Sequence, residues 1–200
     1  MDASDVRPAS MLREGLGFLE LPRLLLSLPE LSRLPRGSGQ PVMVLPGFAT
    51  SDASTFVLQN FLRLLGYRVS GWRMGVNTGR IGTLLPRVLR RVARVATSTG
   101  EPLRLIGWSL GGVFAREVAR ERPELVRRVV TLGTPIRFRE ATPIRVPITA
   151  IWSRADAIVP WQASVDRHSP DVENIEVGAT HIGLGFSADV YRVIADRLAR

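Results

Sequence analysis

The stretch Gly107-Trp108-Ser109-Leu110-Gly111 places a serine between two glycines, each two residues away. An apolar run over residues 102–106 precedes it, and apolar residues with helical spacing follow it, so we expect a turn between a strand and a helix. A tight turn of this kind, a nucleophile elbow, holds the serine hydroxyl above a sheet, and side chains at 107 or 111 would crowd it. The stretch predicts Ser109 as a nucleophile and the Leu110 N–H as a donor to a developing oxyanion.

A serine hydroxyl at neutral pH needs a base within hydrogen-bond reach, and this base is most often an imidazole. The sequence contains only two histidines, His168 and His181. His181 follows the last apolar segment, at residues 174–177, and precedes the last helical pattern, whereas His168 comes before that segment. His168 would therefore begin at the opposite edge of a parallel sheet. This order predicts His181 as the base.

The imidazole in turn needs a carboxylate that fixes its tautomer. Asp156 lies in the loop 153–160, directly after a predicted strand at residues 147–152. The alternatives are the other carboxylates of this region, Asp166, Asp171 and Glu176. The first two lie well into the next connection and the third lies inside a strand, so we favour Asp156. The chain order Ser109, Asp156, His181 is expected when the three follow successive strands.

The elements that must position these residues alternate between strand and helix. The predicted strands are residues 41–45, 67–72, 102–106, 125–132, 147–152 and 174–177. Helices are expected from near Asp52, which could cap the first of them, over an arginine-faced run at residues 85–95, after Ser109, and at residues 187–198. This alternation predicts an α/β fold with a mostly parallel, doubly wound sheet of about six strands and helices on both faces. In such sheets the chemistry collects at the carboxyl ends of the strands.

The loop after the first strand carries Phe48, whose N–H is the expected second oxyanion donor. The side chains of Phe48, Trp108 and Trp161 are candidates for lining an apolar acyl pocket, although ordinary core aromatics would look the same. A glycine-rich loop at residues 75–82 suggests a phosphate site, but no G-K-[ST] motif is present, so that interpretation is discarded.

Composition bounds the remaining function classes. The 200 residues suit one domain, and the absence of cysteine excludes disulfides and thiolate metal sites. Two histidines leave little material for a zinc site, so we expect no metal. All 27 basic residues are arginine, and the formal net charge is +9. Either the surface binds a polyanion or the arginines reflect a GC-rich coding sequence; they are scattered without interleaved aromatics, so we favour the second and expect no nucleic acid.

Residues 1–40 are predicted to form an N-terminal helical extension of a domain at residues 41–200. No secretory signal is recognised, because Asp2 and Asp5 precede any apolar run and no small-residue cleavage site follows one. No membrane span is recognised either, because charged residues and prolines interrupt the leucines. The expected location is therefore cytoplasmic. The leucines either pack on the domain or form an interfacial anchor or a flap, so peripheral membrane contact through this segment stays open.

Residues 41–198 resemble the α/β-hydrolases of the small, single-domain bacterial lipase and esterase type. The resemblance is carried by Val44-Leu45-Pro46-Gly47-Phe48, by the Ser109 stretch, by the Asp156 loop and by Thr180-His181-Ile182-Gly183. It implies a Ser-His-Asp triad, an acyl-enzyme intermediate and no cofactor. Pro46-Gly47 stands where many relatives have His-Gly, and only residues 136–146 stand where larger members insert a cap, so the cap is expected to be minimal.

The expected function is that of a serine hydrolase that cleaves carboxylic esters, either small esters or lipids. A thioesterase or acyltransferase would use the same residues. From a different class, a non-catalytic basic module could bind anionic lipid or nucleic acid.

Overall fold

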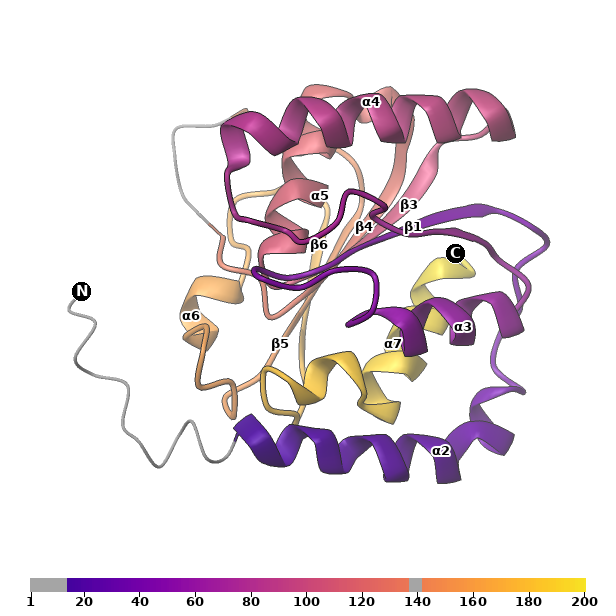
Figure 1. The fold of residues 1–200 in the computed structure, drawn as a ribbon, viewed down its shortest axis with the longest axis vertical. Coiled ribbons are helices and arrows are strands. Elements are labelled where there is room, and N and C mark those ends of the chain that lie inside the picture. The colour runs from indigo at the N-terminus through magenta and orange to yellow at the C-terminus, as the bar shows by residue number, and fades with distance from the viewer. Residues whose placement is uncertain (1–13, 137–141) are drawn as a thin grey trace.

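The computed structural model of the chain describes residues 14–136 and 142–200. In this part of the chain, six parallel strands form one sheet in the spatial order β2-β1-β3-β4-β5-β6 (Figure 1). The strands are β1 (Pro41–Leu45), β2 (Arg68–Ser70), β3 (Leu103–Trp108), β4 (Val126–Leu132), β5 (Ile148–Trp152) and β6 (Val172–Glu176). β1 and β5 are buried along their whole length, as expected for strands covered on both faces. The predicted parallel sheet is confirmed.

Helices cover both faces of this sheet (Figure 1). α4 (Ile81–Thr99) and α5 (Leu110–Glu121) lie on one face, and α2 (Glu20–Leu31), α3 (Phe56–Leu64) and α7 (Ala188–Leu198) lie on the other. Alternate residues of β1 serve the two layers, since Met43 packs with α4 and α5 while Val44 packs with the other three helices. The remaining helical turns are η2 (Leu16–Leu19), η3 (Pro123–Leu125), α6 (Trp161–Ser164) and η4 (Gly183–Gly185).

The chain reverses its direction of winding at β1. It passes from β1 to β2 on one side and returns to β3 on the other side of β1. A crevice forms outside the carboxyl ends of two strands at such a switch point, because the connections leave in opposite directions. The loop after β1 carries Phe48 and the turn after β3 carries Ser109, so the topology brings these two segments together.

Only residues 133–147 separate β4 from β5, and the described ones among them, 133–136 and 142–147, contain no helix or strand. The described residues of this connection thus add no helix or strand over the sheet, in keeping with the short segment in the sequence.

The N-terminal segment packs on the α7 layer. Leu24 and Leu31 of α2 are fully buried in the same apolar cluster as α3 and α7. Burial of a leucine side chain contributes about 1.5–3 kcal/mol, so α2 is held by its apolar stripe. The Glu30 carboxylate adds a surface ion pair with Arg192 at 2.9 Å. No helix of residues 14–136 and 142–200 is long and apolar enough to cross a membrane.

Two local expectations are wrong. α3 begins at Phe56, not near Asp52, and Asp52 does not cap it. The Asp52 carboxylate instead accepts the backbone N–H groups of Trp72 and Arg73, both at 2.7 Å, so a long-range bond replaces the local cap. The predicted glycine-rich loop is also shorter than expected, because α4 already begins at Ile81.

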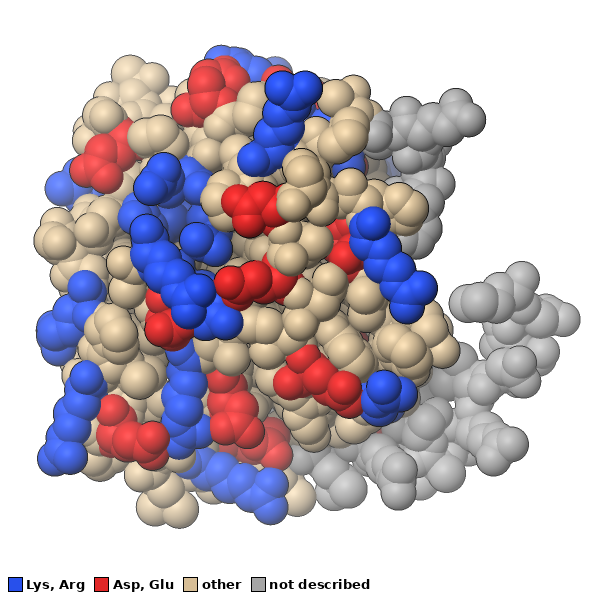
Figure 2. Space-filling model, turned by 180° about the vertical axis from the view of Figure 1, so that it is seen from behind, with Lys and Arg blue, Asp and Glu red and all other residues tan. Residues whose placement is uncertain are grey.

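Arginines are mixed with acidic residues on the surface. Figure 2 shows basic and acidic side chains interspersed over the face seen from behind. Arg197 and Arg200, for example, both pair with Glu173 and Asp196. On α4 the buried stripe and the exposed arginines lie on opposite sides, as the spacing predicts.

Candidate active site

Ser109 occupies a strained turn between β3 and α5. Its backbone has φ 53° and ψ −122°, a region that residues other than glycine rarely adopt. The glycines on each side are required by close packing. A Cβ on Gly107 would lie 2.3 Å from the Gly112 backbone, and one on Gly111 would lie 2.1 Å from the Leu45 oxygen. The turn therefore folds only with these glycines, and it presents the serine side chain at the end of β3.

Backbone bonds hold this turn against the neighbouring strand. The Ser109 N–H donates to the Leu132 carbonyl at the end of β4 over 2.8 Å, and the Ser109 carbonyl accepts the Gly112 N–H over 3.0 Å. Leu110 is the first residue of α5, so its N–H has no carbonyl partner within the helix. That N–H is available to an anion at the helix N-terminus.

His181 and Asp156 form a buried pair from two different loops. The His181 Nδ1 lies 2.6 Å from the Asp156 Oδ2, and the two residues are 5% and 9% exposed. The other oxygen of Asp156 accepts the N–H groups of Ile158 at 2.9 Å and Val159 at 2.7 Å. These bonds orient the carboxylate toward the imidazole. A carboxylate on Nδ1 favours the tautomer in which Nδ1 carries the proton and Nε2 is free to accept one.

Trp108, at the end of β3, contacts the loop that carries His181. Its Nε1–H donates to the His181 carbonyl over 3.1 Å, and its ring centroid lies 6.3 Å from that of the imidazole. On its far side the indole meets Phe186 edge to face, at 6.2 Å. Trp108 is only 8% exposed, and its indole packs between β3 and the His181 loop.

Ser109 and His181 open into one cavity of about 260 Å³. The other residues that line it are Gly47, Phe48, Thr50, Trp108, Ile158 and Ile182. Phe48 and Ile158 stand at its rim and are 62% and 55% exposed. Within the described residues, the Ser109 hydroxyl and the imidazole do not form a hydrogen bond, and bonds of this kind are often long in proteins without substrate. The cavity suits an apolar group held beside the serine.

The Phe48 loop is clamped by Asn77, a fully buried residue. The Asn77 side-chain amide donates to the Pro46 carbonyl over 2.9 Å, and the Asn77 backbone bonds to Ala49 and Thr50 at 2.8 Å each. The Phe48 N–H itself makes no hydrogen bond with any described residue. It is thus free for a ligand in the cavity. Sequence reasoning missed Asn77, because an asparagine in a glycine-rich loop is an ordinary turn residue.

The other candidate residues lie away from this cavity. Trp161 does not line it but stacks on Trp152, with ring centroids 5.1 Å apart, and carries Arg154 on its ring at 4.6 Å. His168 is exposed in the connection to β6. The alternative carboxylates Asp171 and Glu176 have other roles, since the backbone of the first bonds to β5 and the second pairs with Arg154.

Asp166, the remaining alternative, is buried in an ion pair with Arg116 at 2.8 Å. Burial alone would raise its pKa, but hydrogen bonds from Ser169 and from the His168 N–H, together with the Arg116 charge, lower the pKa to about 2. This carboxylate joins α5 to the loop before β6. No group of three His, Asp or Glu within residues 14–136 and 142–200 is placed to hold a metal ion.

Sequence reasoning also missed Glu14, whose buried carboxylate bonds to both the Asp156 and the His181 loops. A lone glutamate in an N-terminal segment carries no signal of such a role.

Comparison with known proteins gives matches in structure alone. No protein-family model and no curated protein sequence matches the chain. Mouse alpha/beta hydrolase domain-containing protein 10 matches with a TM-score of 0.60 and 18% identity, over 82% of this chain and 89% of that one.

Two further solved structures match over the same share of this chain. The monoacylglycerol lipase of Paleococcus ferrophilus matches with a TM-score of 0.63 and 16% identity, over 82% of this chain and 96% of that one. MGS-MChE2, an alpha/beta hydrolase enzyme from a lagoon-sediment metagenome, matches with a TM-score of 0.58 and 17% identity, over 82% and 90%. The chain therefore has the α/β-hydrolase fold.

Proposed function

We propose that the protein is a serine hydrolase that cleaves carboxylic esters. The observation that carries this proposal is the 2.6 Å bond between His181 and Asp156, made beside a serine in a strained turn that shares one cavity with the histidine. A nucleophile, a base and an orienting carboxylate on three loops of one sheet edge are the parts that acyl transfer to serine requires.

In the first half of the reaction, the Ser109 Oγ attacks the ester carbonyl carbon while the His181 Nε2 takes the hydroxyl proton. The carbonyl oxygen becomes an anion, which the Phe48 and Leu110 N–H groups bind. The tetrahedral intermediate then collapses, the carbon–oxygen bond to the alcohol breaks, and His181 returns its proton to the leaving alkoxide. An acyl-serine ester remains.

In the second half, a water molecule attacks the acyl-serine, with His181 as the base again. The new intermediate releases the carboxylic acid and restores the Ser109 hydroxyl. Asp156 accepts the Nδ1–H throughout and stabilises the imidazolium that forms in each half. No external oxidant, metal or cofactor is required by these steps.

The cavity suggests the substrate class. Phe48, Ile158 and Ile182 give it apolar walls, and its volume of about 260 Å³ suits a short or medium acyl chain. The structurally similar Paleococcus protein is a monoacylglycerol lipase, which is in keeping with an ester of a fatty acid. A thioester would present the same carbonyl to the same residues.

Hydrolysis of p-nitrophenyl esters over a range of acyl lengths tests this proposal. Ser109→Ala is expected to lower kcat by about 10⁶-fold, as far as the background permits measurement. Ser98→Ala is the matched control, because Ser98 lies on the exposed side of α4 and bonds only to the Val95 carbonyl. Wild-type protein that hydrolyses neither esters nor thioesters, or full activity in Ser109→Ala, would refute the proposal.

A further inference from the structure

One carboxylate from the N-terminal segment bonds to both loops of the histidine–aspartate pair. The Glu14 Oε1 accepts the N–H of Ala157 at 2.8 Å and the N–H of His181 at 3.2 Å. The Glu14 Oε2 accepts the N–H of Ile182 at 3.0 Å. Glu14 is 4% exposed, and hydrogen bonds to a buried carboxylate are stronger than those between neutral groups.

The positions of these three N–H groups matter. Ala157 follows Asp156 directly, and the other two belong to His181 itself and its neighbour. The 2.6 Å bond between the two side chains depends on how closely the two loops lie, and Glu14 joins the backbones of these loops. Without that carboxylate, the buried His181 N–H and the half-buried N–H groups of Ala157 and Ile182 would lose their partner.

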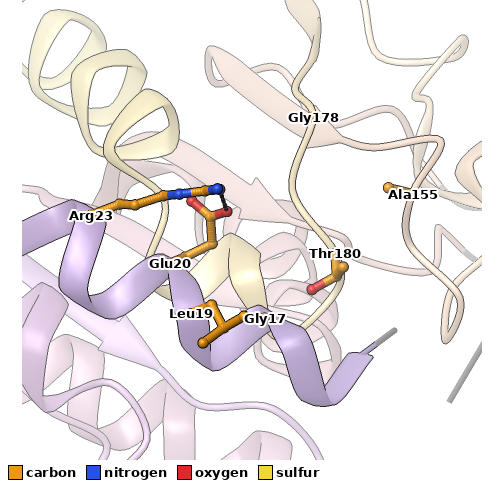
Figure 3. Close-up of a pocket in the computed structure, with 7 residues that line it drawn as sticks. All are labelled: Gly17, Leu19, Glu20, Arg23, Ala155, Gly178 and Thr180. Atoms are coloured by element: carbon orange, nitrogen blue, oxygen red, sulfur yellow. Dashed lines mark hydrogen bonds and ion pairs between the residues drawn. The ribbon is translucent and has the colours of Figure 1, made fainter. Parts of the chain in front are cut away.

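The segment that carries Glu14 lies tightly against the histidine loop. A Cβ on Gly17 would stand 2.5 Å from the Thr180 Oγ1 and 2.7 Å from the Gly183 nitrogen, so only glycine fits there. Figure 3 shows Gly17 beside Thr180, whose hydroxyl points toward the segment. Beyond this contact the segment and the two loops separate around a hollow of about 350 Å³, with Ala155 and Gly178 on its far wall (Figure 3).

The other end of the segment is anchored in the domain. Leu24 and Leu31 are buried against α3 and α7, and Glu30 pairs with Arg192. Because α2 is fixed at this end, Glu14 is held at a set place relative to the sheet. Its carboxylate therefore links the segment that is anchored in the apolar core to the two loops.

We propose that Glu14 is a positioning residue that keeps His181 and Asp156 in register for proton transfer. Its carboxylate accepts backbone N–H groups of the two loops and takes no part in bond making. In the activity assay the proposal rests on the proposed serine mechanism, but the position of His181 can also be measured without turnover.

The test compares Glu14→Gln with wild type. A glutamine has one acceptor oxygen and one amide NH2 group, so at least one of the three N–H donors must face another donor. The matched control is Glu30→Gln, which removes a carboxylate of the same segment that pairs with α7 and does not touch the two loops. Native near-UV circular dichroism reports the folded fraction of each variant.

Two readouts follow the site. The first is the rate at which a fluorophosphonate probe reacts with Ser109 per folded molecule, which we expect to fall on the order of 10- to 100-fold in Glu14→Gln and to stay at the wild-type value in Glu30→Gln. The second is the downfield proton signal of the His181 Nδ1–H, assigned with His168→Gln. We expect that signal to broaden or vanish in Glu14→Gln.

A wild-type labelling rate per folded molecule with a sharp His181 signal in Glu14→Gln would overturn the proposal, even if the variant melts earlier. Should Glu14→Gln fail to fold, Gly17→Ala replaces it, because its methyl group must displace the segment while Glu14 stays; wild-type labelling in that variant would overturn the proposal too. Wild-type protein that never labels refutes the serine mechanism instead, and the His181 signal then decides the role of Glu14.

Discussion

Asp156→Asn is expected to change the tautomer of His181 while it leaves the packing around the imidazole the same. The aspartate uses one oxygen for the Ile158 and Val159 N–H groups and the other for the imidazole. In the asparagine variant the amide oxygen accepts the Ile158 and Val159 N–H groups, because two donors meet at that position. The NH2 group must then face the His181 Nδ1, which becomes an acceptor, and the ring proton moves to Nε2. In that tautomer the imidazole cannot take the Ser109 proton.

The expected loss is large although the shape of the site is kept. In a serine protease triad, the same exchange of aspartate for asparagine lowers kcat by about 10⁴-fold. At about 1.4 kcal/mol per factor of ten, this corresponds to about 5.5 kcal/mol of transition-state stabilisation. Stability should change little, since the two backbone bonds to the carbonyl oxygen remain.

The assay is kcat on a p-nitrophenyl ester, with urea unfolding measured in parallel. Asp166→Asn serves as the control, because Asp166 is also buried but pairs with Arg116, away from the cavity. A decrease in kcat of less than tenfold in Asp156→Asn, or the same decrease in both variants, would refute the assignment of Asp156.

The remaining predictions concern stability. Asp166→Asn leaves the Arg116 guanidinium buried without its partner, so urea unfolding should show a loss of about 3–5 kcal/mol with kcat per folded molecule unchanged. Folding lowers the Asp166 pKa from 3.8 to about 2, so this group contributes about 2 kcal/mol to the free energy of unfolding above pH 4, and this contribution is lost as the pH falls toward 2. Urea unfolding of wild type across this range should show that decrease. A free energy of unfolding that stays constant between pH 4 and pH 2 would contradict the ion pair. Gly111→Ala forces a Cβ to within 2.1 Å of the Leu45 oxygen and should unfold the elbow, whereas Gly82→Ala, with open space around it in α4, should stabilise by about 0.5 kcal/mol; similar melting temperatures for the two would contradict the packing argument.

Much of the fold could be predicted because its signals are local. Buried parallel strands are short apolar runs such as 41–45 and 148–152, and they stand out between glycines and prolines. The alternation of strands and helices then determines that successive strand ends share one edge. That edge is where the loops of Ser109, Asp156 and His181 were expected, and where the structure has them.

The parts that failed depend on distant partners. Asp52 has the residue type of a helix cap, but its carboxylate bonds to the backbone at Trp72 and Arg73 instead. Trp161 follows the Asp156 loop closely, yet α6 turns its ring onto Trp152 and Arg154. In both cases residue type and position allow two partners, and only the packed structure decides between them.

Glu14 marks the limit of such reasoning most clearly. A buried carboxylate is unfavourable unless several donors meet it, so its position has to be explained by those donors. Here the donors are three backbone N–H groups, at residues 157, 181 and 182, and a backbone group leaves no mark in the residue type. No pattern in the sequence could therefore have linked Glu14 to loops more than 140 positions away. Residues that act through the backbone of a site are found by tracing where each buried charge finds its donors, and in this chain that trace leads from the N-terminal segment to the histidine.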